Sequence, residues 1–271
     1  MGHGADIVGE GHGSKRVRLT GLYLPVYSGP PRRRPAAGTL ETAIESLARA
    51  LSLLSSLDPE FLRIIGLSLT VGLAATCAGM FVGVPVGVLL AISRWPGRGV
   101  VVAVVNALMG LPPVVVGLVL YLLLSHSGPL GFAGLLFTPW AMVIAQTALT
   151  TPIVIALSHS AVEPVWAEYG GLLRLYSAST PRIVREMVLG ARHGLLTIFL
   201  AGFGRAISEV GAIIIVGGNI RGYTRTMTTA IALQTSSGDL SLALALGLVL
   251  ITLSICVSGL GFTLRKLGRQ I

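Results

Sequence analysis

The chain has 271 residues, of which 53% are hydrophobic and 11% charged, and its mean hydropathy is +0.81. This composition excludes a soluble globular domain and indicates a protein that crosses a membrane several times. The net charge of +9 comes without the clusters of basic and aromatic residues that bind nucleic acid, and the two cysteines imply neither a disulfide nor a metal site.

Residues 1–58 form a tail before the first long apolar stretch. Their early part is rich in Gly, Pro and Arg, which predicts poor order. No apolar core of a signal peptide lies near Met1. Residues from about 40 to 57 contain a possible helix cap, Thr42–Glu45, and place apolar and charged side chains on opposite faces. Because this stretch is too short to cross a bilayer, we expect an interfacial helix there. A start codon assigned too early is the alternative explanation of the tail.

Five apolar stretches follow, each long enough to cross a hydrocarbon core of about 30 Å as a helix. They lie at about Ile64–Ser93, Val100–Ser125, Pro139–Ala161, Leu195–Val216 and Leu240–Leu264. The predicted fold class is therefore all-α, a polytopic membrane bundle of five core transmembrane helices.

Small residues and prolines mark the first three spans. Small residues recur every four positions in the first span, a pattern that predicts close helix packing, at Ala75, Gly79, Gly83, Gly87 and Ala91. Helix kinks are predicted where prolines interrupt the spans, at Pro85, Pro112, Pro113 and Pro152. Kinked helices surround many transport paths, but they also occur in inert bundles.

The basic residues between the spans predict the orientation. Nine of them lie on the side that holds the loops after spans one, three and five, whereas only Arg221 and Arg225 lie in the opposite loops. Cytoplasmic loops carry the excess of Lys and Arg, so the first side and the C-terminus should be cytoplasmic. The odd number of spans then places residues 1–58 outside, although this tail is itself rich in arginine.

Two charged residues, Arg205 and Glu209, lie near the centre of the fourth span. Either charge alone would cost roughly 2.5–3.5 kcal/mol at the middle of a membrane helix. Their four-residue spacing would place them on one helical face, where each partly neutralises the other. The sequence leaves two interpretations open, a structural ion pair and a pair beside a translocation path.

The connection between spans three and four, about residues 162–194, is the longest in the membrane part of the chain. It contains a predicted short helix, Trp166–Tyr176. Long connections in compact proteins usually carry a function, and the alternative is a solvated connector.

Three sequence blocks carry a family resemblance. They are Leu111–Gly117 with its proline pair, Gly202–Ala212 around the charged pair, and Ile215–Gly222 followed by the Thr-rich Thr224–Ile231. From about Phe61 onward the chain resembles the permease subunits of type I ABC importers, in the branch that transports molybdate, tungstate and sulfate. The run Gly217-Gly218-Asn219 and the Thr-rich segment favour the tungstate type.

The resemblance implies a permease domain at residues 59–265 that forms the path for an oxyanion, tungstate first, with molybdate or sulfate as alternatives. It implies three protein partners in the cell membrane: a cytoplasmic ABC ATPase subunit, an extracytoplasmic substrate-binding protein and a second copy of the chain. The family's docking pattern is degenerate here, so the ATPase-docking loop is placed by position at 163–194. Its candidate contacts are Glu168, Tyr169, Gly171, Arg174, Tyr176 and Ser177.

The absence of a G-x-x-x-x-G-K-[ST] phosphate loop from the sequence predicts that ATP is hydrolysed by the separate subunit. We therefore expect no catalytic residue, cofactor or metal in this chain. Besides Arg205, candidate contacts of the passing anion are the hydroxyls of Thr147, Thr150, Thr151 and Ser208.

Two other classes of protein remain as alternatives. An intramembrane enzyme would need more than the pair Ser125 and His126, which has no acid to orient the imidazole. An ion-coupled secondary carrier would show repeated halves or paired broken helices, which the sequence does not reveal. Transport with and without an ATPase subunit separates these alternatives.

Overall fold

The computed structural model describes residues 7–8, 16–19, 22–25, 48, 52, 58–176 and 179–267. The chain divides into two units, Met1–Glu45 and Ser46–Ile271. In the first unit, β1 (Ile7–Val8), β2 (Arg16–Leu19) and β3 (Leu22–Pro25) form an antiparallel sheet in the order β1-β2-β3. The composition of the tail did not suggest these strands, although Arg16-Val-Arg-Leu19 has the period-two alternation of a strand. Of the predicted interfacial helix at 40–57, Ala48 and Ser52 are helical and the rest lies outside the described residues.

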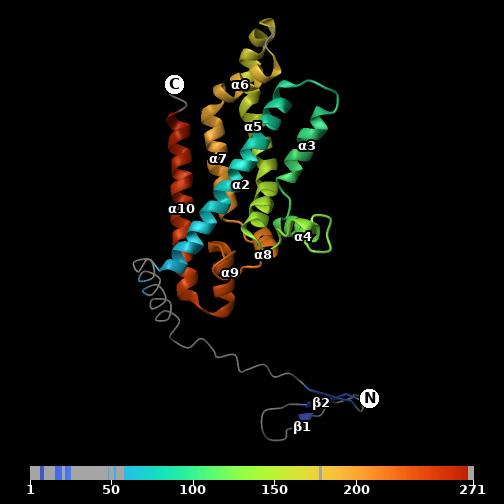
Figure 1. Cartoon of the computed structure of the whole chain (residues 1–271), viewed down its shortest axis with the longest axis vertical. Helices are drawn as coiled ribbons and strands as arrows, with labels where there is room; N and C mark the ends of the chain where they lie inside the picture. The colour runs from blue at the N-terminus through green and yellow to red at the C-terminus, as the bar shows by residue number, and fades with distance from the viewer. Residues whose placement is uncertain are drawn as a thin grey trace. The chain divides into compact units, whose positions relative to one another are not determined.

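The described part of the second unit is a bundle of helices (Figure 1). The α-helices are α2 (Pro59–Ile92), α3 (Arg98–Leu108), α4 (Pro113–Leu124), α5 (Pro139–Leu175), α6 (Thr180–Gly190), α7 (Arg192–Ile207), α8 (Gly211–Gly217), α9 (Met227–Ser237) and α10 (Leu240–Leu267), and a short 3₁₀ helix, η1, spans Gly131–Ala133. By length and composition, α2, α5 and α10 can each cross a membrane. Two bent pairs of helices, α3 with α4 and α6 with α7, could each form one further span. The number of membrane spans is then up to five.

The pair of α2 and α5 lies at the centre of the bundle, and small residues allow their backbones to approach. An added Cβ at Gly83 would lie 2.7 Å from a methyl of Val154, and one at Gly87 would lie 2.7 Å from the carbonyl oxygen of Ile155. The stripe of small residues therefore packs against α5, as its spacing predicted. A larger residue at Gly87 would collide with backbone, which cannot rotate away.

The prolines act differently in different helices. Pro112 precedes α4 in an extended conformation and Pro113 is the first residue of that helix, whose axis is bent by 95° from that of α3. A proline fits the first turn of a helix because its missing N–H is not needed there. Pro85 and Pro152 instead lie inside α2 and α5, which continue past them.

Helix α5 is longer than the sequence predicted. The predicted span ended at Ala161 and was followed by a separate helix at Trp166–Tyr176, whereas α5 runs unbroken to Leu175 with Pro164 inside it. The reason is that an internal proline removes one backbone hydrogen bond but does not oblige a helix to end. Figure 1 shows that one end of the bundle holds helix α6, the α2–α3 turn and the C-terminal ends of α5 and α10. Helices α4, α8 and α9 lie at the other end.

Candidate functional site

The predicted fourth span, Leu195–Val216, is wrong as a single helix. Helix α7 ends at Ile207, and α8 begins at Gly211 after the break formed by Ser208, Glu209 and Val210. Glu209 therefore lies in the break and not on a helical face. A break inside an apolar bundle leaves backbone N–H and C=O groups that other groups must satisfy.

The Glu209 carboxylate satisfies the backbone on the α8 side of the break. One oxygen, Oε1, accepts from the backbone N–H of Val210 at 3.1 Å and from that of Gly211 at 2.8 Å. The other, Oε2, accepts from Nη1 of Arg205. Glu209 is only 5% exposed, so three donors offset the loss of water around its charge. The carboxylate also lies at the start of a short helix, where the backbone N–H groups favour a negative charge.

Neighbouring helices satisfy the carbonyl groups of the break. Gln146 of α5, buried, donates its Nε2–H to the carbonyl oxygen of Ala206 at 2.9 Å. Thr228 of α9 donates its hydroxyl to the carbonyl oxygen of Glu209 at 2.8 Å. Neither Gln146 nor Thr228 was expected at this site from the sequence. Gln146 could have been found as an amide in an otherwise apolar span, but nothing in the sequence indicated its partner.

Glycine is required beside the break because α8 lies against α4. A Cβ on Gly211 would lie 2.8 Å from Val114, and one on Gly117 of α4 would lie 2.8 Å from the Cα of Ala212. These contacts hold α8 in place after the chain has left α7.

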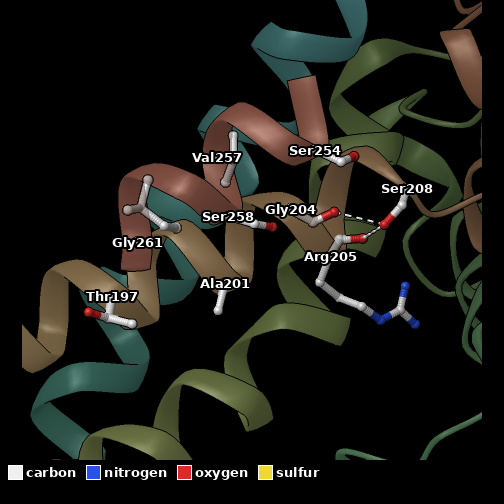
Figure 2. A pocket seen from close by; sticks show the side chains of 10 residues that line it. Thr197, Ala201, Gly204, Arg205, Ser208, Ser254, Val257, Ser258 and Gly261 are labelled. Carbon is white, nitrogen blue, oxygen red and sulfur yellow. Dashed lines mark hydrogen bonds between the residues drawn. The ribbon is translucent and has the colours of Figure 1, made fainter. Parts of the chain in front are cut away.

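Arg205 is the accessible partner of the ion pair, with 40% of its side chain exposed against 6% for Glu209. A pocket of about 520 Å³ lies between α7 and α10 (Figure 2), and Arg205 lines it together with the hydroxyl residues Thr197, Ser208, Ser254 and Ser258. Figure 2 shows the guanidinium of Arg205 extending away from Ser258 and α10. Arg205 therefore lines the pocket, while its guanidinium group points away from α10.

The hydroxyls that were predicted to contact the anion all donate to backbone carbonyl groups of their own helix. Thr147, Thr150 and Thr151 donate to the residue four positions earlier at 2.7–2.8 Å, and Ser208 donates to Gly204 at 2.7 Å. A hydroxyl has one proton, so in this geometry each presents only an acceptor to its surroundings. Thr150 is moreover 1% exposed, and its methyl group packs where Gly79 and Gly202 leave space. Of the four, Ser208 lines the pocket between α7 and α10, and the three threonines are not among the residues that line it.

The run Gly217-Gly218-Asn219 ends α8 and begins a compact loop to α9. Gly218 and Asn219 both have positive φ, 69° and 50°, and a Cβ on Gly218 would lie 2.8 Å from the ring of Phe137. The Thr224 hydroxyl donates to the carbonyl oxygen of Gly217 at 2.5 Å and accepts from the N–H of Ile220 at 3.0 Å. The motif thus shapes a tight turn, which only residues tolerant of left-handed backbone can make.

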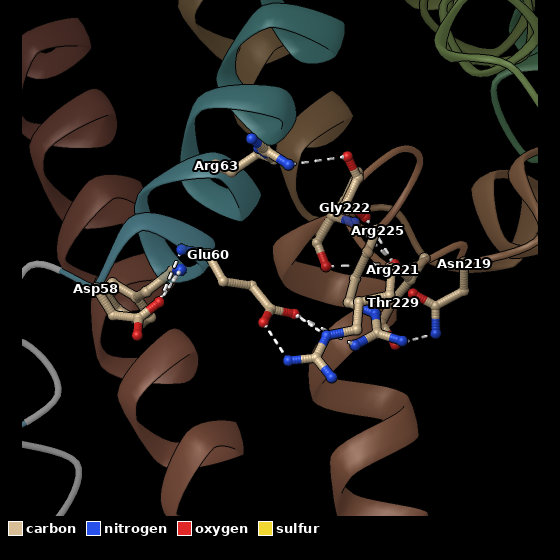
Figure 3. Close-up of polar contacts among 10 residues, drawn as sticks. Asp58, Glu60, Arg63, Asn219, Arg221, Gly222, Arg225 and Thr229 are labelled. Carbon is tan, nitrogen blue, oxygen red and sulfur yellow. Dashed lines mark hydrogen bonds and ion pairs between the residues drawn. The ribbon is translucent and has the colours of Figure 1, made fainter.

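An ion pair anchors this loop to the start of α2 (Figure 3). Arg221 donates from Nε and Nη2 to the two carboxylate oxygens of Glu60 at 2.7 and 2.5 Å, and Arg225 lies 3.9 Å from the same carboxylate. The hydrogen bond with Glu60 raises the pKa of Arg221 above its ordinary value, so the arginine stays charged at every physiological pH. Arg63 donates to the carbonyl oxygen of Gly222 at 3.5 Å. The contacts of this cluster were not predicted from the sequence.

The residues expected at the ATPase-docking loop lie on the last turns of α5. Glu168, Tyr169, Gly171 and Arg174 are exposed there, and Tyr176 caps the helix with 79% of its surface exposed. The Arg174 guanidinium lies over the Trp166 ring, 5.0 Å from its centroid. Ser177 lies outside the described residues. This tip also exposes Leu172 and Leu175, an apolar surface suited to contact with a protein.

Comparison with known proteins identifies the chain. Residues 83–266 match the family described as the binding-protein-dependent transport system inner membrane component. The chain belongs to this family. It is an ABC importer permease of the branch that includes tungstate, molybdenum and sulfate systems, a multi-pass membrane protein and not an enzyme. Importers of this family work with a separate ATPase and a substrate-binding protein.

Three relatives illustrate the likeness. The permease is 41% identical over 207 residues to a probable anion ABC transporter permease protein of Haloferax volcanii, covering 74% of this chain and 89% of that one. It is 38% identical to the tungstate uptake system permease protein TupB of Peptoclostridium acidaminophilum, covering 84% and 100%. It is 31% identical to the molybdenum transport system permease protein ModB of Azotobacter vinelandii, covering 65% and 81%.

The solved structures confirm the predicted fold class. A structure of the MetNI methionine ABC transporter in an inward-facing conformation matches with a TM-score of 0.63 at 18% identity, covering 76% of this chain and 94% of that one. The helical bundle of the permease therefore has the type I importer fold.

Proposed function

We propose that this permease forms the membrane path of an ATP-driven tungstate importer. The observation that carries the proposal is the gradient of similarity: 38% identity over the whole of a tungstate uptake permease, against 31% over 81% of a molybdenum permease. The turn at Gly217-Gly218-Asn219, which resembles the tungstate type, supports the same choice. Molybdate and sulfate are the alternative substrates.

The Arg205–Glu209 pair offers the means for an anion to pass without being trapped. Arg205 is partly exposed and uses one of its N–H donors on Glu209, so the others can face a passing oxyanion. The buried carboxylate of Glu209 offsets most of the attraction that a lone arginine would exert on a dianion. A contact of this kind is weak, and weak contacts permit fast release, so selectivity belongs with the substrate-binding protein.

The coupling to ATP would occur at the end of α5. Its exposed Tyr169, Leu172, Leu175 and Tyr176 form the surface to which the ATPase subunit would bind. A second copy of the chain would complete the path, since one bundle lines one side only. Closure of two ATPase subunits would then bring the two α5 ends together and switch the path between the two sides of the membrane.

The test is uptake of radioactive tungstate, molybdate and sulfate into proteoliposomes that contain the permease, its ATPase and its binding protein. We expect ATP-dependent uptake with tungstate preferred, and none with an ATPase subunit that cannot hydrolyse ATP. Preference for molybdate or sulfate would reassign the substrate. Uptake driven by an ion gradient without the ATPase would overturn the proposed mechanism.

The orientation is tested by labelling introduced cysteines with an impermeant thiol reagent in intact cells. A cysteine placed near Arg98 or Arg182 should stay unlabelled, and one at Ser127 or Gly238 should label. The variants are made in a chain whose own Cys77 and Cys256 are replaced by alanine. Labelling at Arg182 would reverse the proposed topology. A cysteine at Gly29 should label if the tail lies outside.

A further inference from the structure

A polar cluster lies where α5 leaves the predicted membrane span, at the end of the bundle that also holds α6. Its centre is Arg98, the first residue of α3, whose Nη2 lies 2.7 Å from Nε2 of His159 on α5. His159 is 9% exposed and the Arg98 side chain is 28% exposed, so water reaches this contact from the arginine side only in part. From the sequence, Arg98 counted only toward the orientation and His159 had no assigned role, and neither residue belongs to the helix break.

Arg98 joins three structural elements through one side chain. Its Nε donates to the carbonyl oxygen of Leu90 at 2.6 Å, in the last turn of α2, where helical carbonyl groups have no partner within the helix. Its Nη2 also reaches the carboxylate of Glu163 on α5 at 3.4 Å. Arg98 therefore holds the end of α2 and the start of α3 against α5 at a single point.

The contact determines the protonation of His159. Every polar hydrogen of a guanidinium is a donor, so the short contact requires that Nε2 accept through its lone pair, and the imidazole carries its proton on Nδ1. A doubly protonated ring would place two N–H donors and two positive charges face to face. Arg98 and Glu163 are the charged groups that act on the ring, and α2 approaches the backbone of His159 through Gly87, which has no side chain. Glu163 is 58% exposed, so its charge is largely screened by water.

The cluster lies at a mechanically useful place. Helix α5 continues for 16 residues beyond His159, to Leu175, a length of about 24 Å at 1.5 Å per residue. These residues include the surface that we assign to the ATPase. Because α5 is one unbroken helix, a displacement of its end is carried to His159, and the Arg98 contact is the polar link from there to α2 and α3.

We propose that Arg98 and His159 are the positioning pair that transmits movement of the ATPase-facing end of α5 to the α2–α3 turn, and that the pair holds only while the imidazole is neutral. Acidification on the ATPase side of the membrane would then uncouple ATP hydrolysis from transport. The inference rests on the proposed function in assigning the end of α5 to the ATPase, whereas the neutrality of His159 rests on the geometry alone.

The first test measures anions transported per ATP hydrolysed in proteoliposomes, with pH varied from about 7.5 to about 5 on the ATPase side, a range in which histidine titrates. In wild type, the number of anions transported per ATP hydrolysed should fall several-fold on acidification. His159→Gln should keep the ratio near neutral pH and lose the pH dependence, because an amide oxygen accepts from Arg98 without titrating. His126→Gln, which changes an exposed histidine between α4 and η1 on the side opposite to the ATPase, controls for the loss of a histidine and should follow wild type. A His159→Gln variant as sensitive to acid as wild type would overturn the pH dependence.

A third variant tests the link itself. Arg98→Gln removes the positive charge and the bond to Leu90, so ATP hydrolysis should continue with less transport per ATP at every pH. An unchanged ratio in Arg98→Gln would overturn the positioning role.

The second test needs no transport. A group that is neutral when folded and free to bind a proton when unfolded makes stability rise with pH. The Tm of the purified wild-type chain should therefore fall on acidification, with a smaller fall in both His159→Gln and Arg98→Gln, and an unchanged fall in His126→Gln. Equal pH dependence of Tm in all four proteins would overturn the neutral assignment. If wild type transports no anion, the proposed function fails, and this measurement still decides the protonation of His159.

Discussion

The helix break predicts a definite order of stability among substitutions of Glu209 and Arg205. Glu209→Met leaves the N–H groups of Val210 and Gly211 without the acceptor that now lies 3.1 and 2.8 Å away. A buried unsatisfied donor costs about 1–3 kcal/mol, so two of them should cost about 2–6 kcal/mol. Glu209→Gln keeps an amide oxygen for these donors but loses the charge and the acceptor of Arg205, at about 1–2 kcal/mol because the partly exposed Arg205 can turn to water.

Arg205→Met should be intermediate. It leaves the buried carboxylate with two backbone donors but no cation. Removing one partner of a buried pair costs about 3–5 kcal/mol, and the 40% exposure of Arg205 reduces this to about 1–3 kcal/mol. The double change of Arg205 to Met and Glu209 to Gln discards both charges together, so it should be more stable than Arg205→Met alone.

The assay is thermal unfolding of the purified chain in lipid nanodiscs, together with the yield of protein in the membrane. Glu186→Gln on α6, outside the break, is the control for loss of a carboxylate. A Glu209→Met variant as stable as Glu209→Gln would show that the carboxylate does not hold the break. The double variant should fold but fail to transport. Full uptake by it would show that the pair is only structural, and Arg205 would lose its proposed role in the path.

The remaining predictions concern the ends and the centre of the bundle. Replacing Tyr169 or Tyr176 by Asp should reduce uptake per ATP without changing membrane insertion, because a charge is placed on the surface assigned to the ATPase; unchanged uptake in both would remove this surface from coupling. Gly87→Ala should destabilise the chain by about 1–3 kcal/mol in thermal unfolding, because its Cβ would meet backbone of α5 at 2.7 Å. Gly66→Ala, at a position with open space around it, is the matched control, and equal effects of the two would refute the packing argument.

Much of the fold follows from apolar stretches and charge. The start of α10 at Leu240 and the interruption at Pro112 and Pro113 were predicted from hydropathy and from proline chemistry, because both depend on local sequence. The family resemblance was likewise carried by short blocks, of which the one around Gly217-Gly218-Asn219 has a physical basis in positive φ. For these features the chain's own residues are sufficient.

The site was only partly accessible from the sequence. The spacing of Arg205 and Glu209 suggested a pair on a helix, and the structure joins the two residues across the last turn of α7 and a break. Hydropathy measures how well side chains tolerate lipid and does not show which backbone N–H donates to a side chain in place of a helical carbonyl group. The same carboxylate that suggested a helical ion pair in fact caps the next helix.

The sequence by itself determined that this protein crosses a membrane several times and which family it resembles, because these depend on composition, length and short motifs. The tertiary structure decided that α7 stops at Ile207, that α5 continues through Pro164, and that Arg98 meets His159, 61 positions away. Each of these depends on where a polar group finds its partner. In a bundle from which water is largely excluded, that partner comes from another helix, and its position exists only once the helices are packed.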